Sequence, residues 1–123
     1  MPQQGKNILI VEDDADVRGA LTAVLESEGY GVVGAADGRE ALQHLRANAE
    51  GFCMILLDLW MPVMNGWEFR AEQMKDPTLA AVPVIVVTAD HAAAKSATGL
   101  AAVEYMTKPI EMDHLLEQIA RYC

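Results

Sequence analysis

A carboxylate directly follows an apolar run in the middle of the chain. Met54 to Leu57 is continuously apolar, and Asp58 comes next without an intervening turn residue. Short runs of this kind are typical of buried strands. Other apolar runs are also followed by residues that carry charge or a hydroxyl group: Glu12, Asp13, Thr88 and Lys108. These residues could form one site if the strands bring their ends together.

The chemistry of such a site follows from its charges. Two carboxylates about 4 Å apart repel by roughly 4 kcal/mol at an effective dielectric constant near 20, so the cluster needs a counter-charge. Mg²⁺ suits it, because this ion prefers oxygen ligands and binds one or two carboxylates together with phosphate oxygens. No His or Cys lies among the candidates, which disfavours zinc. A carboxylate there could attack phosphorus and form an aspartyl phosphate, with a lysine and a hydroxyl group stabilising the transferred oxygens.

The elements that must position these residues alternate along the chain. Helix-length segments separate five strand-like runs, at residues 8–11, 30–35, 54–57, 82–87 and 103–106. This pattern predicts an α/β fold with a doubly wound, five-stranded parallel sheet and helices on both faces. In such sheets the site lies beyond the carboxyl ends of the strands, where the candidate residues are placed.

The bulk composition limits the class of protein. The 123 residues suit one domain, 1–123, and no apolar run approaches the roughly 20 residues of a membrane span. The first residues lack a secretory signal, so we expect a cytoplasmic protein. A net charge of −9 argues against direct binding to nucleic acid or an anionic membrane. Cys53 and Cys123 fit no metal pattern; we expect no disulfide and a buried, inert Cys53.

The candidate residues fall in motifs at four strand ends. These motifs are VEDD at 11–14, LLDLWMP at 56–62 with Gly66, VTA at 87–89 and YMTKP at 105–109. The set resembles the receiver domain of two-component response regulators, in particular chemotaxis-type regulators, over nearly the whole chain. This resemblance implies a flavodoxin-like fold with strand order 2-1-3-4-5.

The resemblance also implies roles for individual residues. Asp58 would be the phosphoacceptor, and Mg²⁺ would be bound by Asp13, Asp58 and the Trp60 backbone carbonyl, with Glu12 acting through water. Thr88 and Lys108 would hold the phosphoryl oxygens, and Thr88 and Tyr105 would form the switch. The implied donor is a phosphohistidine on a sensor histidine kinase or a histidine phosphotransfer protein. The chain would be a signalling receiver that catalyses only its own phosphorylation and dephosphorylation.

Three other functions are weighed against this one. Phosphotransferases with an aspartate nucleophile typically have a second Asp two positions later, where this chain has Trp60. A flavodoxin-like cofactor binder needs a phosphate loop after the first strand, where this chain has residues 12–14, all acidic. A phosphorylation-independent, receiver-like interaction module remains the alternative. Asp14 we interpret as a helix cap rather than a metal ligand.

The segment from 91 to 101 departs from the family pattern. The distance from Thr88 to Lys108 is a couple of residues shorter than usual, and Leu100 is the only large aliphatic residue of the segment. An alanine-rich face buries little area, at roughly 25 cal/mol per Å². We therefore expect a short or mobile, weakly docked helix here and a smaller role for it in signalling.

Overall fold

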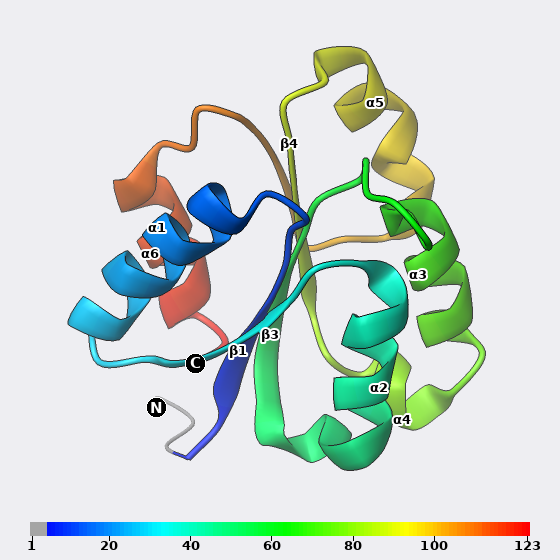
Figure 1. Ribbon diagram of the computed structural model, residues 1–123, viewed down its shortest axis with the longest axis horizontal. Coiled ribbons are helices and arrows are strands. Elements are labelled where there is room, and N and C mark those ends of the chain that lie inside the picture. Colours follow the sequence, from blue (N-terminus) through cyan, green and yellow to red (C-terminus); the bar gives the residue numbers. More distant parts are fainter. Residues whose placement is uncertain (1–4) are drawn as a thin grey trace.

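A five-stranded parallel sheet forms the centre of the molecule. The computed structural model describes residues 5–123, leaving aside the side chains at positions 96 and 98 (Figure 1). The strand order is β2-β1-β3-β4-β5, and the neighbouring strands run parallel, as the sequence predicts. The strands are β1 Asn7–Val11, β2 Gly31–Ala35, β3 Phe52–Leu57, β4 Val84–Thr88 and β5 Glu104–Thr107.

Helices cover both faces of the sheet (Figure 1). Two helices lie on one face, α1 Ala15–Ser27 and α6 Met112–Ala120. The other face carries α2 Gly38–Asn48, α3 Gly66–Met74, α4 Pro77–Ala80 and α5 His91–Ser96, together with the 3₁₀ turns η1 Ala49–Gly51 and η2 Ala97–Leu100. The one-turn helix α4 was not predicted from the sequence. No helix in the described part of the chain has the length and apolar character to cross a membrane.

The core consists of two apolar layers, one on each side of the sheet. All six residues of β3 are buried, because this central strand is covered on both faces. Alternate side chains of the strands enter opposite layers: Leu9 and Ile55 face α2 and α3, whereas Ile8 and Met54 face α1 and α6. Burial on both faces explains why β1, β3 and β4 read as continuous apolar runs, whereas the edge strands β2 and β5 are only partly buried.

Polar side chains define where the helices begin. Asp14 caps α1, and its carboxylate accepts hydrogen bonds from the backbone N–H groups of Asp16 and Val17 at 2.9 and 3.2 Å. This confirms that Asp14 is a cap. Asn65 and Glu68 form a reciprocal capping box at the start of α3. Asp14 ends the loop that follows β1 and Asn65 ends the loop that follows β3, so the caps also help to fix the loops that carry the candidate site.

The alanine-rich helix is short, as predicted. α5 spans six residues, His91–Ser96, and the chain continues as the 3₁₀ turn η2. The buried residues of α5 and η2 include Ala93 and Ala97, respectively, whose side chains remove little apolar area from water. The expected mobility and weak docking of this helix stay predictions.

The two cysteines form a disulfide, so the expectation of no disulfide was wrong. Cys53 at the start of β3 is bonded to Cys123, with 5.5 Å between their Cα atoms. Both residues are buried, as expected for Cys53. The chain after α6 turns back toward the beginning of the central strand and brings Cys123 to Cys53. The sequence does not show this proximity, because the two cysteines are 70 positions apart and form no recognisable motif.

Candidate functional site

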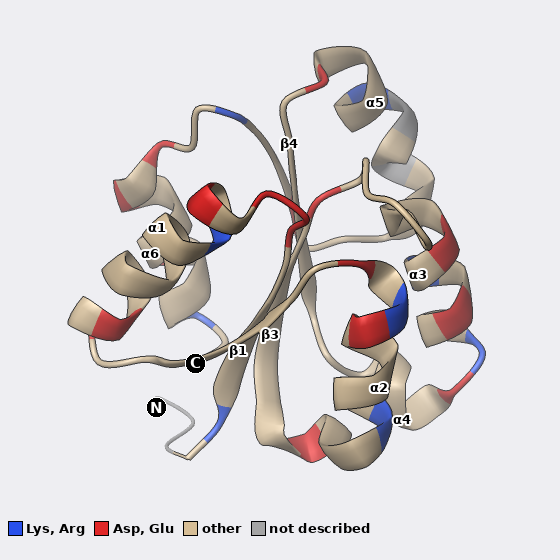
Figure 2. Cartoon of the chain, viewed as in Figure 1, with Lys and Arg blue, Asp and Glu red and all other residues tan. Residues whose placement is uncertain are grey.

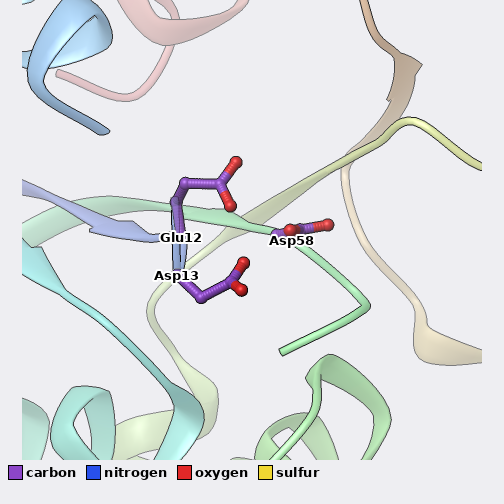
Figure 3. A group of neighbouring side chains, drawn as sticks. All are labelled: Glu12, Asp13 and Asp58. Carbon is purple, nitrogen blue, oxygen red and sulfur yellow. The ribbon is translucent and has the colours of Figure 1, made fainter. Parts of the chain in front are cut away.

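Three carboxylates meet where β1 and β3 end. Val11 and Leu57 are the last paired residues of the two strands, and the backbone N–H of Asp58 donates to the Val11 carbonyl at 3.0 Å. This register places Asp58 beside Glu12 and Asp13, and one oxygen atom from each carboxylate lies within 4.8 Å of the others. In Figure 3 the side chains of Glu12 and Asp13 project from the end of β1 toward the side on which Asp58 lies. Acidic residues gather at this edge of the sheet (Figure 2).

The carboxylates are crowded in a partly dry environment. Glu12 and Asp58 are 3% and 8% exposed, whereas Asp13 reaches solvent. Burial and the neighbouring Glu12 raise the pKa of Asp58 to about 7, although Lys108 and the backbone N–H of Trp60 act in the opposite direction. Burial and Glu12 also raise the pKa of Asp13. The cluster therefore holds more negative charge than its surroundings neutralise, and a hard divalent cation fits it.

Lys108 supplies the positive charge nearest to the cluster. It follows β5, forms a close ion pair with Glu12, and places its Nζ atom 3.8 Å from Oδ2 of Asp58. Burial acts to raise the pKa of Glu12, but the hydrogen bond from Lys108 helps to lower it below its ordinary value. The Lys108–Pro109 peptide bond is cis, and the Lys108 backbone N–H donates to the Thr88 carbonyl at 2.8 Å. The ion pair with Glu12 holds the ammonium group beside the phosphoacceptor candidate.

Thr88 ends β4 at the same edge of the sheet. It is fully buried, and its Oγ1 atom accepts a hydrogen bond from the Asp90 backbone N–H at 3.2 Å. Its strand partner is Thr107, the residue before Lys108. The structure therefore brings the hydroxyl candidate and the ammonium candidate together on adjacent strands.

Trp60 lies at the rim of the site. Its side chain is 55% exposed, its Nε1 atom donates to Oδ2 of Asp90 at 3.2 Å, and its ring packs edge-on against Trp67 with 4.8 Å between centroids. Asp90 also caps α5. The role of Asp90 was missed in the sequence; its position before a helical segment signals a cap, but nothing signals the bond to Trp60. The neighbouring Val63 is exposed and adopts a left-handed conformation, with φ 66°.

Tyr105 lies on β5, the edge strand. Its ring packs against the core layer beneath α2 and α3, and its hydroxyl oxygen accepts a hydrogen bond from the Ala102 backbone N–H at 3.0 Å. The candidate switch residue is thus connected to the loop before its own strand.

The site is open rather than a deep pocket. The cavity bordered by Glu12, Asp58 and Lys108 has a volume of about 10 Å³. This cavity is far smaller than the roughly 300–1,000 Å³ that organic ligands occupy. A phosphoryl group presented from outside needs no such volume.

Comparison with known proteins identifies the family. The model of the response regulator receiver domain matches residues 8–120. This chain belongs to that family. The receiver's curated relatives include PilH of Pseudomonas aeruginosa, which is 33% identical over 114 residues, covering 91% of this chain and 93% of PilH. They also include the transcriptional regulatory protein CrdR of Helicobacter pylori, 37% identical over 95% of this chain.

Solved structures give the same result for the fold. The response regulator TrrA of Thermotoga maritima, in complex with Mg²⁺ and BeF, is 30% identical, with a TM-score of 0.84 over 96% of this chain and 99% of TrrA. The chemotaxis protein CheY4 of Vibrio cholerae is 30% identical, with a TM-score of 0.81 over 96% of this chain and 98% of CheY4. The receiver spans about half the length of two curated relatives, 54% of CrdR and 49% of YkoG from Bacillus subtilis.

Proposed function

We propose that this receiver accepts a phosphoryl group on Asp58 and changes conformation to control the binding of a partner protein. The implied donor is a phosphohistidine of a sensor histidine kinase or a histidine phosphotransfer protein. The single observation that carries this proposal is the placement of Asp58 among Glu12, Asp13 and Lys108 at the end of the central strand.

The transfer would form one bond and break another. An Asp58 carboxylate oxygen attacks phosphorus, an O–P bond forms, the N–P bond to the donor histidine breaks, and the electron pair returns to the imidazole nitrogen. Lys108 lies 3.8 Å from Asp58 and can balance charge on the transferred oxygens. The Thr88 hydroxyl, at the same edge, is the second candidate donor to them. The rigid β3 strand holds the nucleophile in place.

The carboxylate cluster fits Mg²⁺. Asp13, Asp58 and the Trp60 backbone carbonyl would hold the ion, with Glu12 acting through water. When bound, Mg²⁺ would neutralise charge on the carboxylates and on the phosphoryl oxygens. The raised pKa of Asp58 supports this fit, because a site that disfavours its own ionisation gains from a cation.

The proposed switch involves Thr88 and Tyr105. A phosphoryl group carries about −1.5 to −2 charge and three acceptor oxygens, so it would draw the Thr88 hydroxyl away from Asp90. Tyr105 would then move toward the space that Thr88 leaves. The surface around β5 would thereby differ between the two forms, and a partner that binds one of them would sense the phosphoryl group.

Labelling with a small phosphodonor tests the function. The wild type, incubated with acetyl phosphate or phosphoramidate and Mg²⁺, should acquire one phosphoryl group at Asp58, located by mass spectrometry. Omitting Mg²⁺, or changing Asp58→Asn, should abolish the adduct. An unlabelled wild type in the presence of Mg²⁺ would contradict the proposal and favour a phosphorylation-independent interaction module.

A further inference from the structure

Arg70 is a buried cation on α3 that lies outside the site described above. It is 6% exposed, and burial lowers the pKa of its guanidinium group. Its Nε atom donates to the Leu100 carbonyl at 2.8 Å, Nη2 to the Ala101 carbonyl at 3.3 Å, and Nη1 to Oε1 of Gln73 at 2.6 Å. All three acceptors are neutral. A buried guanidinium arranged in this way recognises backbone geometry rather than a counter-ion.

Gln73 extends this polar cluster in the opposite direction. It is fully buried, and its Nε2 atom donates to the carbonyls of Leu79 and Val82 at 2.8 and 3.1 Å. The hydrogen bonds of the pair Arg70 and Gln73 therefore extend in two directions, which we call the Arg70 branch and the Gln73 branch. The Arg70 branch holds the loop before β5, and the Gln73 branch holds α4 and the segment that joins it to β4.

The Arg70 branch ends at the candidate switch residue. Ala101 adopts a left-handed conformation, with φ 56°, which is uncommon for a residue with a side chain. The guanidinium binds the carbonyls of Leu100 and Ala101, and the next N–H group, that of Ala102, donates to the Tyr105 hydroxyl at 3.0 Å. A continuous series of hydrogen bonds thus runs from α3 to Tyr105.

Apolar packing fixes this loop only in part, because Leu100 and Ala102 are partly buried against the core layer. The preceding segment, α5 and η2, buries the small side chains of Ala93 and Ala97. A neutral hydrogen bond is worth about 0.5–1.5 kcal/mol net, and bonds from a charged donor about 1.5–3 kcal/mol. The guanidinium is therefore a strong polar restraint on the backbone between Leu100 and Ala102, beside the partial packing of these two side chains and the bond from the Val103 N–H to the Val84 carbonyl at 2.8 Å.

We propose that Arg70 is a positioning residue for the switch, because it fixes the loop that holds the Tyr105 hydroxyl. This inference rests on the proposed function. A contact that is made in only one of two conformations stabilises that conformation. Inward movement of Tyr105 breaks its bond to Ala102, so Arg70 favours the resting arrangement and lowers the affinity for the phosphoryl group.

A titration with beryllofluoride and Mg²⁺ tests this role, with tryptophan fluorescence as the signal. Trp60 and Trp67 are the two tryptophans of the chain, and Trp60 lies two positions after Asp58. Arg70→Met should bind the analogue about 3- to 10-fold more tightly, the change expected from losing about one net hydrogen bond. Tyr105→Phe, which removes the acceptor and keeps the ring, should have a similar effect. In the Tyr105→Phe background, Arg70→Met should add no further increase.

Two variants separate this role from general stability. Gln73→Met breaks the other branch and also removes the acceptor of Arg70 Nη1, so it should lower the melting temperature. It should raise the affinity for beryllofluoride less than Arg70→Met does, because the bonds from Arg70 to the Leu100 and Ala101 carbonyls remain. Arg121→Met removes an exposed arginine that pairs with Glu117, and it should change neither quantity. Should Arg70→Met fail to fold, Arg70→Lys, which retains one donor group, should show a smaller increase in affinity.

The outcomes are distinguishable. Wild-type affinity in Arg70→Met, or in Tyr105→Phe, would overturn the inference, and so would independent, additive effects of the two changes. A wild-type protein that binds no beryllofluoride in the presence of Mg²⁺ would overturn the proposed function and this inference with it.

Discussion

Two requirements on the protonation of the Asp58 carboxyl group oppose each other. A nucleophile must be ionised to attack phosphorus, but burial and Glu12 raise the pKa of Asp58 to about 7. Without a metal, much of the population is therefore protonated at neutral pH. A bound cation would favour the ionised form, so metal binding would also activate Asp58 as the proposed nucleophile.

The raised pKa of Asp58 predicts a pH-dependent difference in stability. Below its ordinary pKa of 3.8, Asp58 is protonated in both the folded and the unfolded chain. Between 3.8 and about 7 the unfolded chain loses this proton and the folded chain keeps it, so stability falls as the pH rises. Metal-free Asp58→Asn should therefore melt several degrees above the wild type at neutral pH and show a smaller advantage under acidic conditions. A difference in melting temperature that does not vary with pH would contradict the raised pKa.

Mg²⁺ should stabilise the folded receiver by mass action. Millimolar Mg²⁺ should raise the melting temperature of the wild type by a few degrees at neutral pH. Asp13 is the exposed member of the cluster, so Asp13→Ala should fold normally and lose this increase. Asp14→Ala, at the neighbouring cap, should lower the melting temperature and keep the increase. If Mg²⁺ leaves the wild type unchanged, the carboxylates do not form a metal site.

Trp60 should slow the loss of the phosphoryl group. Its indole ring is held at the rim by Asp90 and Trp67, where it can exclude water from the acyl phosphate. Trp60→Asn should dephosphorylate severalfold faster and still be phosphorylated by acetyl phosphate. Asp90→Asn keeps the cap of α5 and removes the Oδ2 acceptor, so it should have a smaller effect in the same direction. An unchanged rate in Trp60→Asn would instead identify Trp60 as a contact for partners.

At the scale of elements, the start of α3 is packed directly against the site. A Cβ atom on Gly66 would lie 2.7 Å from the Asp58 carbonyl oxygen and 2.8 Å from the Leu59 Cα atom. Gly66→Ala should cost roughly 1–3 kcal/mol of folding free energy and slow the labelling of Asp58. Gly19→Ala is the matched control, since its Cβ would meet open space within α1. That change should stabilise the protein by about 0.5–1 kcal/mol, and a loss of stability in both variants would contradict this account.

The sequence predicts the strands well because buried strands consist of consecutive apolar residues, which can be recognised locally. The apolar runs MILL and VPVIVV predict β3 and β4 from local sequence alone, without information from the rest of the chain. The helix α4 was missed because a single turn has too few residues to show a period. Arg70 was missed for a different reason: an arginine on a helix reads as a surface residue, and only tertiary structure shows that it is buried against carbonyl groups.

The site residues that directly follow strands could be predicted as reliably as the ends of those strands. Asp58, Glu12 and Lys108 each follow a strand, so the parallel direction of the strands places them at one edge of the sheet. Their proximity also depends on the strand order, which the family resemblance implied. Contacts that depend on loops, such as the bond from Trp60 to Asp90, were not predictable because loop conformation depends on packing. The roles in metal binding and in the switch stay predictions.

At the scale of the whole molecule, the disulfide between Cys53 and Cys123 should contribute strongly to stability. Closing a loop across 70 positions stabilises the fold by about 4 kcal/mol through the entropy of the unfolded chain. Reductant should therefore lower the melting temperature of the wild type by more than about 10 °C. Cys123→Ser should melt at the lower temperature with or without reductant. Equal melting temperatures of the oxidised and reduced wild type would contradict the prediction.

This disulfide also bears on where the receiver works. Reducing compartments keep most thiols reduced, so a cytoplasmic location and a persistent Cys53–Cys123 bond oppose each other. The location expected from the sequence stays a prediction. Measuring free thiols in protein trapped directly from cells would show which form of the pair exists there.

The same bond changes how the molecule responds to pulling. Because Cys123 is joined to the start of the central strand, tension applied to the two ends of the oxidised chain reaches β3 directly and bypasses α6. The covalent loop cannot extend, so the oxidised protein should lengthen on forced unfolding by about 240 Å less than the reduced protein, at about 3.4 Å per residue. Asp58 lies within that shielded loop, whereas Glu12 and Asp13 lie on the part that extends. Mechanical rupture would therefore separate the acidic cluster while the strand that carries Asp58 stayed within the covalent ring.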